Sequence, residues 1–369
     1  MRVRYSPLAQ QFAEVDEIFA DLRELVKSAD FTLGKVVNEF EQLFAATVGV
    51  KHAIGVGSGT DALKIPLKAI GIQPGDEVIT CANTFYATVG AMNEVGAKIV
   101  FIDCDDTFCM NVDQLEKAIT PKTRAIIPVH LTGDVAEIPR IMEIAKKHNL
   151  RVIEDGCQSL MGEYNGQRVG TFGDACAFSM HPLKIINVWG DAGIVVTNDD
   201  EMNRRVRLLR NHGLRNRDEM ETLGYNSRLD STQAVIGKWI LKKIQDIVAG
   251  RIAAAKYYDK GFAGIPGVMV PARKPHTKNV YLLYILFVEG RDALLNYCIA
   301  KGIEAKVHYP IPLHLQDALK FLGYKAGDFP VSERHCRETI SFPVDQHLSR
   351  AEQDYVIETV REFYSGRKR

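Results

Sequence analysis

Two segments, RVIEDGCQ at residues 151–158 and CAFSMHPLK at residues 176–184, decide the fold. Each begins as a short apolar run and ends in polar residues, which is typical of a buried strand whose carboxyl end faces a ligand. The first run ends at Asp155 and is followed by Gln158, while the second passes Ser179 and reaches Lys184. We therefore expect two buried strands that deliver an acid, an amide, a hydroxyl and an amine to ligand sites.

Similar short apolar runs recur on both sides of these segments, with amphipathic helix patterns between them. The predicted strands cover residues 53–57, 77–81, 98–103, 124–129, 151–155, 176–180 and 194–197. The predicted helices cover residues 36–47, 60–70, 85–94, 136–147 and 201–211. This alternation predicts an α/β domain built on a mostly parallel, seven-stranded sheet.

The pattern changes after residue 230. A long amphipathic helix over 231–248 and a second helix near 250–262 precede a loop marked by Pro266, Pro271 and Pro275. A strand over 281–289, a helix over 291–301, a strand over 305–308 and a final helix over 350–364 then follow. We expect a large α/β domain over residues 1–248 and a smaller C-terminal α+β domain over residues 249–369.

Composition excludes several classes of protein. The 369 residues carry 46 basic and 46 acidic side chains, so the formal net charge is zero and favours neither nucleic-acid nor anionic-membrane binding. The N-terminus lacks the apolar core of a secretory signal, and no apolar run reaches the roughly 18 residues of a membrane span. The seven cysteines are scattered without a Cys-x-x-Cys pair, which indicates buried, reduced thiols and no metal site. We expect a cytoplasmic protein.

The stretch GSGTDA, residues 57–62, follows a predicted strand and opens a predicted helix. The first N–H groups of a helix have no internal partner, and glycine lets a ligand approach the backbone closely. Gly59 and Thr60 are therefore candidates for binding a single phosphate. The alternative is a glycine-rich turn with an ordinary helix cap, because such short patterns occur often without a ligand.

The residues at the two strand ends fit the needs of pyridoxal phosphate. That cofactor needs a lysine amine to bond its aldehyde, a carboxylate to keep its pyridine nitrogen protonated, and groups that bind its phosphate. Lys184 supplies the amine, Asp155 the carboxylate, and Ser179 a hydroxyl for the phosphate, while Gln158 can donate to the phenolic oxygen. Taken singly, Asp155 can also form a structural ion pair or a helix cap, and Lys184 can lie on the surface.

Three further residues have both a functional and a structural interpretation. Phe85 follows a strand end and can stack on the pyridine ring or belong to the core. His181 can touch the substrate or only pack. Asn226 precedes a long helix, where it can serve as an ordinary turn or cap residue.

These segments, in this order, resemble the DegT/DnrJ/EryC1/StrS family of pyridoxal-phosphate-dependent sugar aminotransferases, which have the fold of type I transferases. The resemblance runs along nearly the whole chain and includes eight or more short segments. They are FTLG at 31–34, SGT at 58–60, TF at 84–85, PVHL at 128–131, ED at 154–155, SMHPLK at 179–184, YNSRLD at 225–230 and HYP at 308–310.

The resemblance implies a role for each matching residue of the cofactor site. Lys184 resembles the lysine that bonds the cofactor, Asp155 the acid at the pyridine nitrogen, and Gln158 the partner of the phenolic oxygen. The residues implied in the remaining contacts are Gly59, Thr60 and Ser179 for the phosphate and Phe85 for stacking on the ring.

The resemblance also implies substrate contacts and a partner. Asn226 resembles a residue that reaches the cofactor phosphate of the neighbouring subunit, which implies a homodimer with shared active sites. His308 and Tyr309 lie where family members approach the sugar, and His181 is a further candidate for a contact to substrate. Arg210, His212 and Arg228 are candidates for binding the nucleotide diphosphate.

The activity implied is ping-pong transfer of an amino group from L-glutamate to a keto-deoxysugar nucleotide, with pyridoxamine phosphate as the intermediate form of the cofactor. The amino sugar would serve polysaccharide or secondary-metabolite biosynthesis. The segment YNSRLD slightly favours amination at C3 over C4. Two alternatives remain open, a non-catalytic regulatory protein that binds pyridoxal phosphate and another enzyme of this fold, such as a desulfurase or a lyase.

Overall fold

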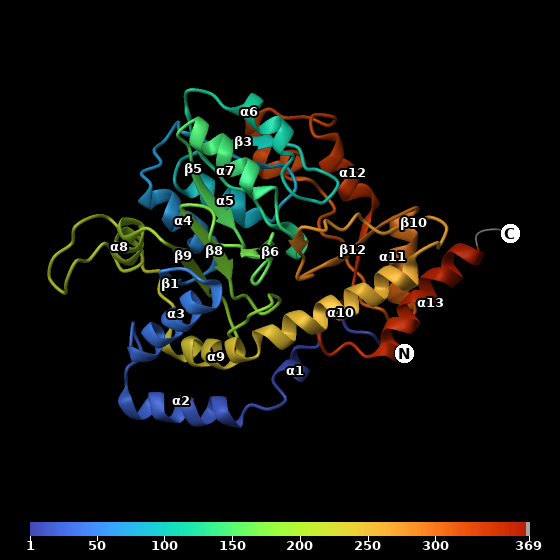
Figure 1. Cartoon of the computed structure of the whole chain (residues 1–369), viewed down its shortest axis with the longest axis horizontal. Coiled ribbons are helices and arrows are strands. Elements are labelled where there is room, and N and C mark those ends of the chain that lie inside the picture. The colour runs from blue at the N-terminus through green and yellow to red at the C-terminus, as the bar shows by residue number, and fades with distance from the viewer. Residues whose placement is uncertain (367–369) are drawn as a thin grey trace.

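The computed structural model describes residues 1–366, and its centre is a seven-stranded sheet (Figure 1). The strand order is β1-β9-β8-β5-β4-β2-β3, and only β9 runs antiparallel to its neighbours. The strands are β1 (His52–Val56), β2 (Glu77–Cys81), β3 (Lys98–Ile102), β4 (Thr123–Ile126), β5 (Arg151–Asp155), β8 (Ala175–Ser179) and β9 (Gly193–Thr197). All seven predicted strands are present, and the mostly parallel α/β sheet is confirmed.

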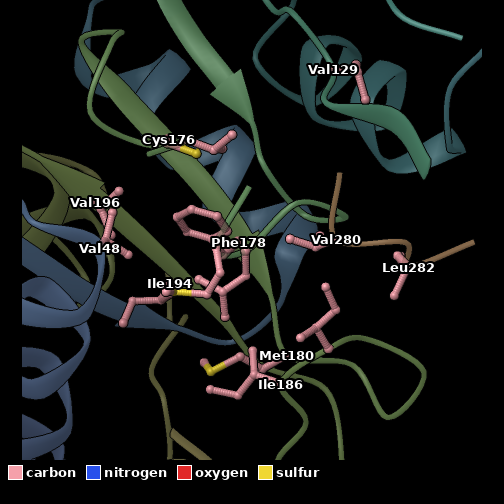
Figure 2. Packing of buried hydrophobic residues seen from close by; sticks show 14 of the residues in the cluster. Val48, Val129, Cys176, Phe178, Met180, Ile186, Ile194, Val196, Val280 and Leu282 are labelled. Atoms are coloured by element: carbon pink, nitrogen blue, oxygen red, sulfur yellow. The ribbon is translucent and has the colours of Figure 1, made fainter. Parts of the chain in front are cut away.

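Helices cover both faces of this sheet. Helices α3 (Lys35–Val48), α7 (Ile138–Lys147) and α9 (Ser231–Lys242) share one hydrophobic cluster with the sheet, and α4 (Gly59–Ala69), α5 (Tyr86–Glu94) and α8 (Asp200–Leu209) share a second. Neighbouring residues of one strand point to opposite clusters, because side chains alternate along a strand. Phe178 and Ile194, for example, pack with Val48 and Val196 on the α3 side (Figure 2), whereas Ala177 and Val195 belong to the opposite cluster.

The C-terminal part has its own small sheet and hydrophobic cluster. The sheet order is β10-β12-β13, with β10 (Val268–Met269), β12 (Tyr284–Val288) and β13 (Thr339–Phe342) all antiparallel. Helices α11 (Arg291–Ala300), α12 (Pro330–Glu338) and α13 (Arg350–Gly366) accompany it. Its cluster includes Val3 from the N-terminus, whose backbone pairs with Ile303. The first residues of the chain therefore pack against the C-terminal part, and their assignment to the large domain over residues 1–248 stays a prediction.

Shorter elements complete the described chain. They are helices α1 (Leu8–Gln11), α2 (Asp16–Ser28) and α6 (Leu115–Ala118), and a small sheet of β6 (Glu163–Tyr164), β7 (Gln167–Arg168) and β11 (Thr277–Lys278). Within residues 1–366, no helix is both long and apolar enough to cross a membrane. Six of the seven cysteines are buried, as predicted, and Cys157 is half-buried.

The predicted end of the long helix over 231–248 is wrong. Helix α9 stops at Lys242, and α10 (Ile244–Phe262) then runs without a break toward α13 (Figure 1). Helical geometry is interrupted at Lys243, although Ile244, Ile247 and Val248 of α10 still pack in the hydrophobic cluster of the large sheet, and apolar spacing does not report such an interruption. Gly250 lies inside α10, where a Cβ would come within 2.6 Å of the Gln346 Cβ, so this glycine permits close packing. The domain boundary predicted after residue 248 falls within α10 and stays a prediction.

The strand predicted over 305–308 does not form. Only Lys306 pairs with the small sheet, through a single bridge to Ser341. The chain then turns His308 and Tyr309 into a cavity, and Pro310 has no N–H to donate to a neighbouring strand. This segment contributes to the site and not to the sheet.

A buried ion pair joins α3, β1 and α8. The Glu41 carboxylate accepts hydrogen bonds from the Gly55 backbone N–H at 2.8 Å and from the guanidinium of Arg210, and both charged side chains are buried. Arg210 also donates to the Gly55 carbonyl at 2.8 Å, so its charge is committed to the protein and the prediction that it binds a diphosphate is wrong. Removing one partner of such a pair leaves the other charge buried without compensation.

We predict that Glu41→Gln lowers the free energy of unfolding by about 3–5 kcal/mol, because the Arg210 charge stays buried. Guanidinium denaturation of the cofactor-free protein, followed by circular dichroism, measures this change. The control is Glu17→Gln, which removes an ion pair with Lys242 whose two side chains are more than half exposed and should change stability little. An E41Q variant as stable as the wild type would contradict the prediction.

Candidate active site

A cavity of about 250 Å³ lies at the carboxyl ends of the central strands, between the large sheet and the C-terminal part. The N-terminal segment supplies Tyr5 and Ser6 to its wall, and the C-terminal part supplies Arg251 and Lys306. Ten of the predicted site residues line it: Gly59, Thr60, Phe85, Asp155, Gln158, Ser179, His181, Lys184, His308 and Tyr309.

One end of the cavity has the features of a phosphate site. Helix α4 begins there, with the Ser58 hydroxyl accepting the Asp61 N–H at 3.1 Å as its cap. A Cβ on Gly59 would lie 2.7 Å from the Ser179 Cβ, so only glycine lets this serine approach the helix start so closely. The unpaired N–H groups of α4, Thr60 and the Ser179 hydroxyl therefore surround one position suited to an anion.

Asn226 and Arg228 do not line this cavity. Asn226 is exposed, and Arg228 donates to the Asn211 side chain at 3.1 Å. Ser227 between them holds the loop against the start of α4, because its hydroxyl accepts from Gly57 N–H at 3.0 Å and donates to Asp61 at 2.8 Å. The exposed position of Asn226 leaves it available to a second subunit, and its role stays a prediction.

Asp155 is a buried carboxylate without a cationic partner. Its oxygens accept from the Thr88 hydroxyl at 2.8 Å and the Cys157 N–H at 3.2 Å, and it forms no ion pair within residues 1–366. A buried charge is costly unless it is compensated. The protonated nitrogen of a pyridine ring would compensate it, so this position fits pyridoxal phosphate. Thr88 was not singled out from the sequence, because nothing in a helix pattern shows which residue faces a strand end.

Lys184 faces the same space from the turn that follows β8. Its N–H donates to the His181 carbonyl at 2.8 Å, and its Nζ lies 5.9 Å from the centre of the Phe85 ring. The amine has no hydrogen bond or ion pair in the described part of the chain. Burial lowers the pKa of this amine, although Cys157 and Asp155 oppose the shift. A neutral amine is the form that attacks an aldehyde.

Phe85 is 45% exposed, so it is a wall of the cavity and not a core residue. Its ring contacts those of Tyr86 and Tyr309, at centroid distances of 5.2 and 5.9 Å. Gln158 is oriented by its carbonyl oxygen, which accepts the Thr132 N–H at 2.9 Å, and its amide nitrogen donates to the Tyr309 hydroxyl at 3.3 Å. The amide nitrogen carries two N–H donors, so one of them remains for a ligand oxygen in the cavity.

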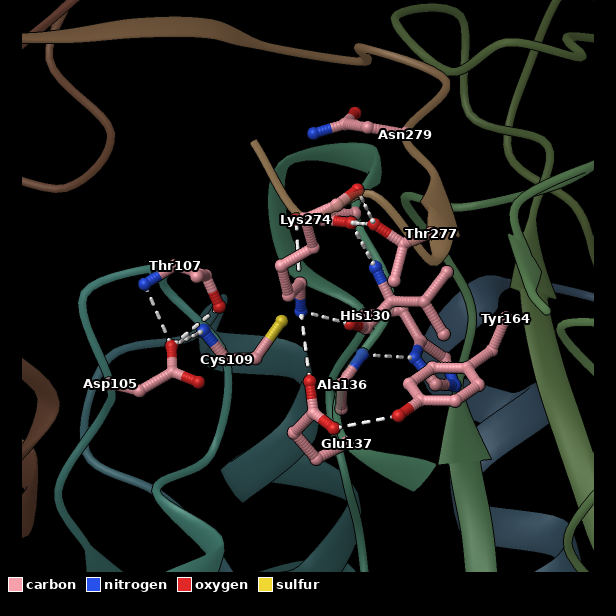
Figure 3. A network of polar contacts seen from close by, with 12 residues as sticks. Asp105, Thr107, Cys109, His130, Ala136, Glu137, Tyr164, Lys274, Thr277 and Asn279 are labelled. Carbon is pink, nitrogen blue, oxygen red and sulfur yellow. Dashed lines mark hydrogen bonds and ion pairs between the residues drawn. The ribbon is translucent and has the colours of Figure 1, made fainter. Parts of the chain in front are cut away.

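A polar network fixes the loop that orients Gln158 (Figure 3). Thr277 donates to Asp134 at 2.7 Å, and Tyr164 donates to Glu137 at 2.8 Å. Lys274 is half-buried beside both acids and donates to the Val135 carbonyl. The network ties the C-terminal part to the loop over residues 130–137, and so to Gln158.

The two histidines of the cavity are both engaged by the protein. His181 accepts the Leu183 N–H at its Nδ1, 3.2 Å away, which holds the turn before Lys184. The Nδ1 of His308 lies 2.9 Å from the Ser341 hydroxyl. Burial, together with the charges of Lys306 and Lys184, lowers the pKa of His308 to about 4. His308 is therefore neutral at physiological pH.

The comparison with protein families covers almost the whole chain. The model of the DegT/DnrJ/EryC1/StrS aminotransferase family matches residues 13–361. The chain belongs to this family. The resemblance inferred from the short segments is confirmed.

Individual relatives support the same assignment. The chain is 40% identical over 368 residues to a "Pleiotropic regulatory protein" of Geobacillus stearothermophilus, covering 99% of each chain. It is 38% identical over 364 residues to a "dTDP-3-amino-3,4,6-trideoxy-alpha-D-glucose transaminase" of Streptomyces venezuelae, covering 98% and 96%. It is 41% identical over 362 residues to a "UDP-N-acetyl-3-dehydro-alpha-D-glucosamine 3-aminotranferase" of Acidithiobacillus ferrooxidans, covering 98% and 95%.

Solved structures agree in fold. S. venezuelae DesV superposes with a TM-score of 0.96 at 38% identity, covering 98% of both chains. The PLP form of a putative sugar aminotransferase from Streptococcus pneumoniae gives 0.91 at 28% identity, covering 99% of both. The family member described here is a sugar aminotransferase that uses pyridoxal phosphate, and the predicted fold class, enzyme class and cofactor are confirmed. No cluster suited to a metal ion occurs among residues 1–366.

We predict that Gly59→Ala weakens the binding of pyridoxal phosphate by at least about tenfold, or 1.4 kcal/mol, because the new Cβ displaces Ser179. Titration of the cofactor-free protein, followed by protein fluorescence, gives the dissociation constant. The matched control is Gly90→Ala in α5, where a Cβ meets no atom within 4 Å and affinity should not change. Equal affinities for G59A and wild type would show that Gly59 is not at the phosphate.

Proposed function

We propose that this enzyme transfers the amino group of L-glutamate to C3 of a keto-deoxysugar nucleotide by a ping-pong mechanism. The observation that carries the proposal is the pairing of an uncommitted Lys184 amine with a buried, uncompensated Asp155 carboxylate in one cavity. That pairing suits amino-group transfer, which needs both a neutral amine and a fixed negative charge at the pyridine nitrogen.

The bound cofactor supplies an aldehyde that takes up the amino group and a ring that withdraws electrons from the reacting carbon. Asp155 holds the ring nitrogen protonated, and Thr88 and the Cys157 N–H hold that carboxylate in place. Lys184 would hold the cofactor through its amine and, when that amine is free, its Nζ would move a proton between the α-carbon of the donor and the cofactor. The same amine carries the reverse transfer toward the keto sugar.

The remaining residues position the cofactor and the substrates. Gly59, Thr60 and Ser179 bind the phosphate, and Phe85 covers one face of the ring. Gln158 donates to the phenolic oxygen. His308 and Tyr309 line the same cavity, where they would contact the sugar.

Position C3 and a nucleotide-linked acceptor are supported by the relatives. The Streptomyces protein carries a 3-amino sugar in its name, and the Acidithiobacillus protein is a 3-aminotransferase of a UDP sugar. Since these names differ in the nucleotide and agree in the position, they favour C3 and leave dTDP and UDP open.

A homodimer with shared active sites is also part of the proposal. Large apolar side chains stay exposed at the cavity wall and close to it in the sequence, with exposed fractions of 45% and 46% at Phe85 and Leu183 of the wall and 47% and 42% at Tyr86 and Trp189. An apolar group of this kind at a site indicates a covering partner. A second copy of the chain would cover it and would bring Asn226 to the phosphate.

The second candidate is a regulatory protein that binds the cofactor without catalysis, which the name of the Geobacillus relative favours. Such a protein has no need of a proton-transferring amine. Lys184, Asp155, Gln158 and Ser179 are all present and face one cavity, which favours the enzyme.

We predict that Lys184→Ala lowers turnover by at least about 10²-fold, because proton transfer by a positioned group contributes 10²–10⁴-fold. Formation of amino sugar, followed by mass spectrometry, measures turnover. The control, Lys256→Ala, removes an exposed lysine of α10 and should leave turnover unchanged. A K184A variant that kept most of its turnover would contradict the assignment.

The position of amination is tested with the enzyme loaded with pyridoxamine phosphate. We expect a 3-keto-deoxysugar nucleotide to yield the amino sugar and the 4-keto isomer to yield little, with nuclear magnetic resonance locating the amine. An amine at C4 would overturn the choice of C3 while leaving the aminotransferase activity in place.

A further inference from the structure

Few positive charges of the cavity wall are free to meet a substrate. The wall contains three side chains of cationic type, Lys184, Arg251 and Lys306. Arg251 is committed, because it pairs with Asp345 at 3.2 Å and donates to the Val344 and Tyr281 carbonyls at 2.9 and 3.1 Å. Lys184 is the reacting amine. Neither of these charges is available to bind an anionic substrate.

The two histidines of the wall do not supply the missing charge. His308 is neutral at physiological pH, since its pKa is lowered to about 4. His181 uses Nδ1 to accept a backbone N–H, which requires that nitrogen to be unprotonated.

Lys306 is the remaining cationic side chain of the cavity wall. Its side chain is exposed, and it has no ion pair among residues 1–366. The nearby carboxylate of Glu304 is occupied by Arg2 at 3.0 Å and by the Tyr5 N–H at 3.0 Å. Lys306 is therefore the one cation of the described cavity wall whose charge is neither committed to the protein nor used in the reaction.

Contacts with neighbouring residues also hold Lys306 in place. Its backbone N–H and carbonyl both pair with Ser341, at 3.0 and 2.8 Å. Its Nζ lies 4.5 Å from the centre of the Tyr5 ring, and Tyr5 is held by its bond to Glu304. A cation over an aromatic face is attracted to it, so the ring keeps the ammonium group beside the cavity.

We propose that Lys306 binds the anionic group of the substrate, a carboxylate of the amino donor or the diphosphate of the sugar nucleotide. This inference rests on the proposed function, in which both substrates are anionic. In a ping-pong reaction they occupy the same cavity in turn, so one cation serves either substrate. Lys306 is thus a substrate-binding residue that no short sequence pattern pointed to.

The test compares Lys306→Met, which keeps the apolar stem over Tyr5, with Lys306→Arg, which keeps the charge. The probes are maleate, a dicarboxylate without an amino group, and inorganic pyrophosphate. Calorimetry gives their affinities for the cofactor-loaded protein. The control is Lys256→Met, on the exposed face of α10.

We expect K306M to bind at least one probe about tenfold more weakly, the loss of one charged hydrogen bond, and K306R to stay within about threefold of wild type. Weaker binding of maleate alone identifies the donor carboxylate, and weaker binding of pyrophosphate alone identifies the diphosphate. Weaker binding of both identifies a shared site. Unchanged affinities in K306M, or no binding of either probe by wild type, would overturn the proposal.

The proposed function is judged separately, by whether L-glutamate converts the bound cofactor of the wild type. If that conversion failed while K306M still lost affinity for a probe, the anion site would stand and the aminotransferase proposal would fall. If L-glutamate converted the cofactor while K306M bound both probes like the wild type, the aminotransferase proposal would stand and the anion site would fall.

Discussion

The site depends on one buried negative charge that the protein itself does not neutralise. Asp155 lies at the end of β5 with only a hydroxyl and an N–H as hydrogen-bond donors. Such a charge is costly in a folded protein until a cation joins it. In the proposed assignment the cofactor ring would supply that cation and so offset the cost of burying Asp155. The same charge would keep the ring in its electron-withdrawing form.

The fold brings the other reacting groups to that charge. Strands β5 and β8 are parallel neighbours, with Asp155 paired to Ala177, so the turn after β8 begins beside the acid. The start of α4 approaches Ser179 closely because residue 59 is glycine. An acid, an amine and an anion site therefore meet at one sheet edge, as expected for the carboxyl ends of parallel strands.

Much of this could be predicted from the sequence, and the failures have physical causes. Strands buried on both faces leave short apolar runs, so β5 and β8 were predicted to within a residue. The break at Lys243 was missed because both helices keep an apolar face across the bend. Residues 305–308 were predicted as a strand because apolar and polar side chains alternate along them. The chain turns into the cavity there and forms no strand.

Site residues outside the short sequence segments were not predictable, even where they lie a few residues from one. Thr88 and Tyr5 carry no pattern of their own, since their roles arise from contacts across the fold. Lys306 looks like any surface lysine in the sequence. Only the structure shows that its ammonium group has no ion-pair partner within residues 1–366, that it lies over the Tyr5 ring and that it belongs to the cavity wall.

The central claim is that the cavity holds pyridoxal phosphate on Lys184 and exchanges its aldehyde for the amino group of L-glutamate. An absorbance spectrum of the purified enzyme, before and after adding L-glutamate, tests it most directly. We predict that the visible band of the lysine-bound cofactor disappears and the ultraviolet band of pyridoxamine phosphate replaces it, with 2-oxoglutarate released in equal amount. A spectrum unchanged by L-glutamate, or no cofactor band after addition of pyridoxal phosphate, would contradict the account.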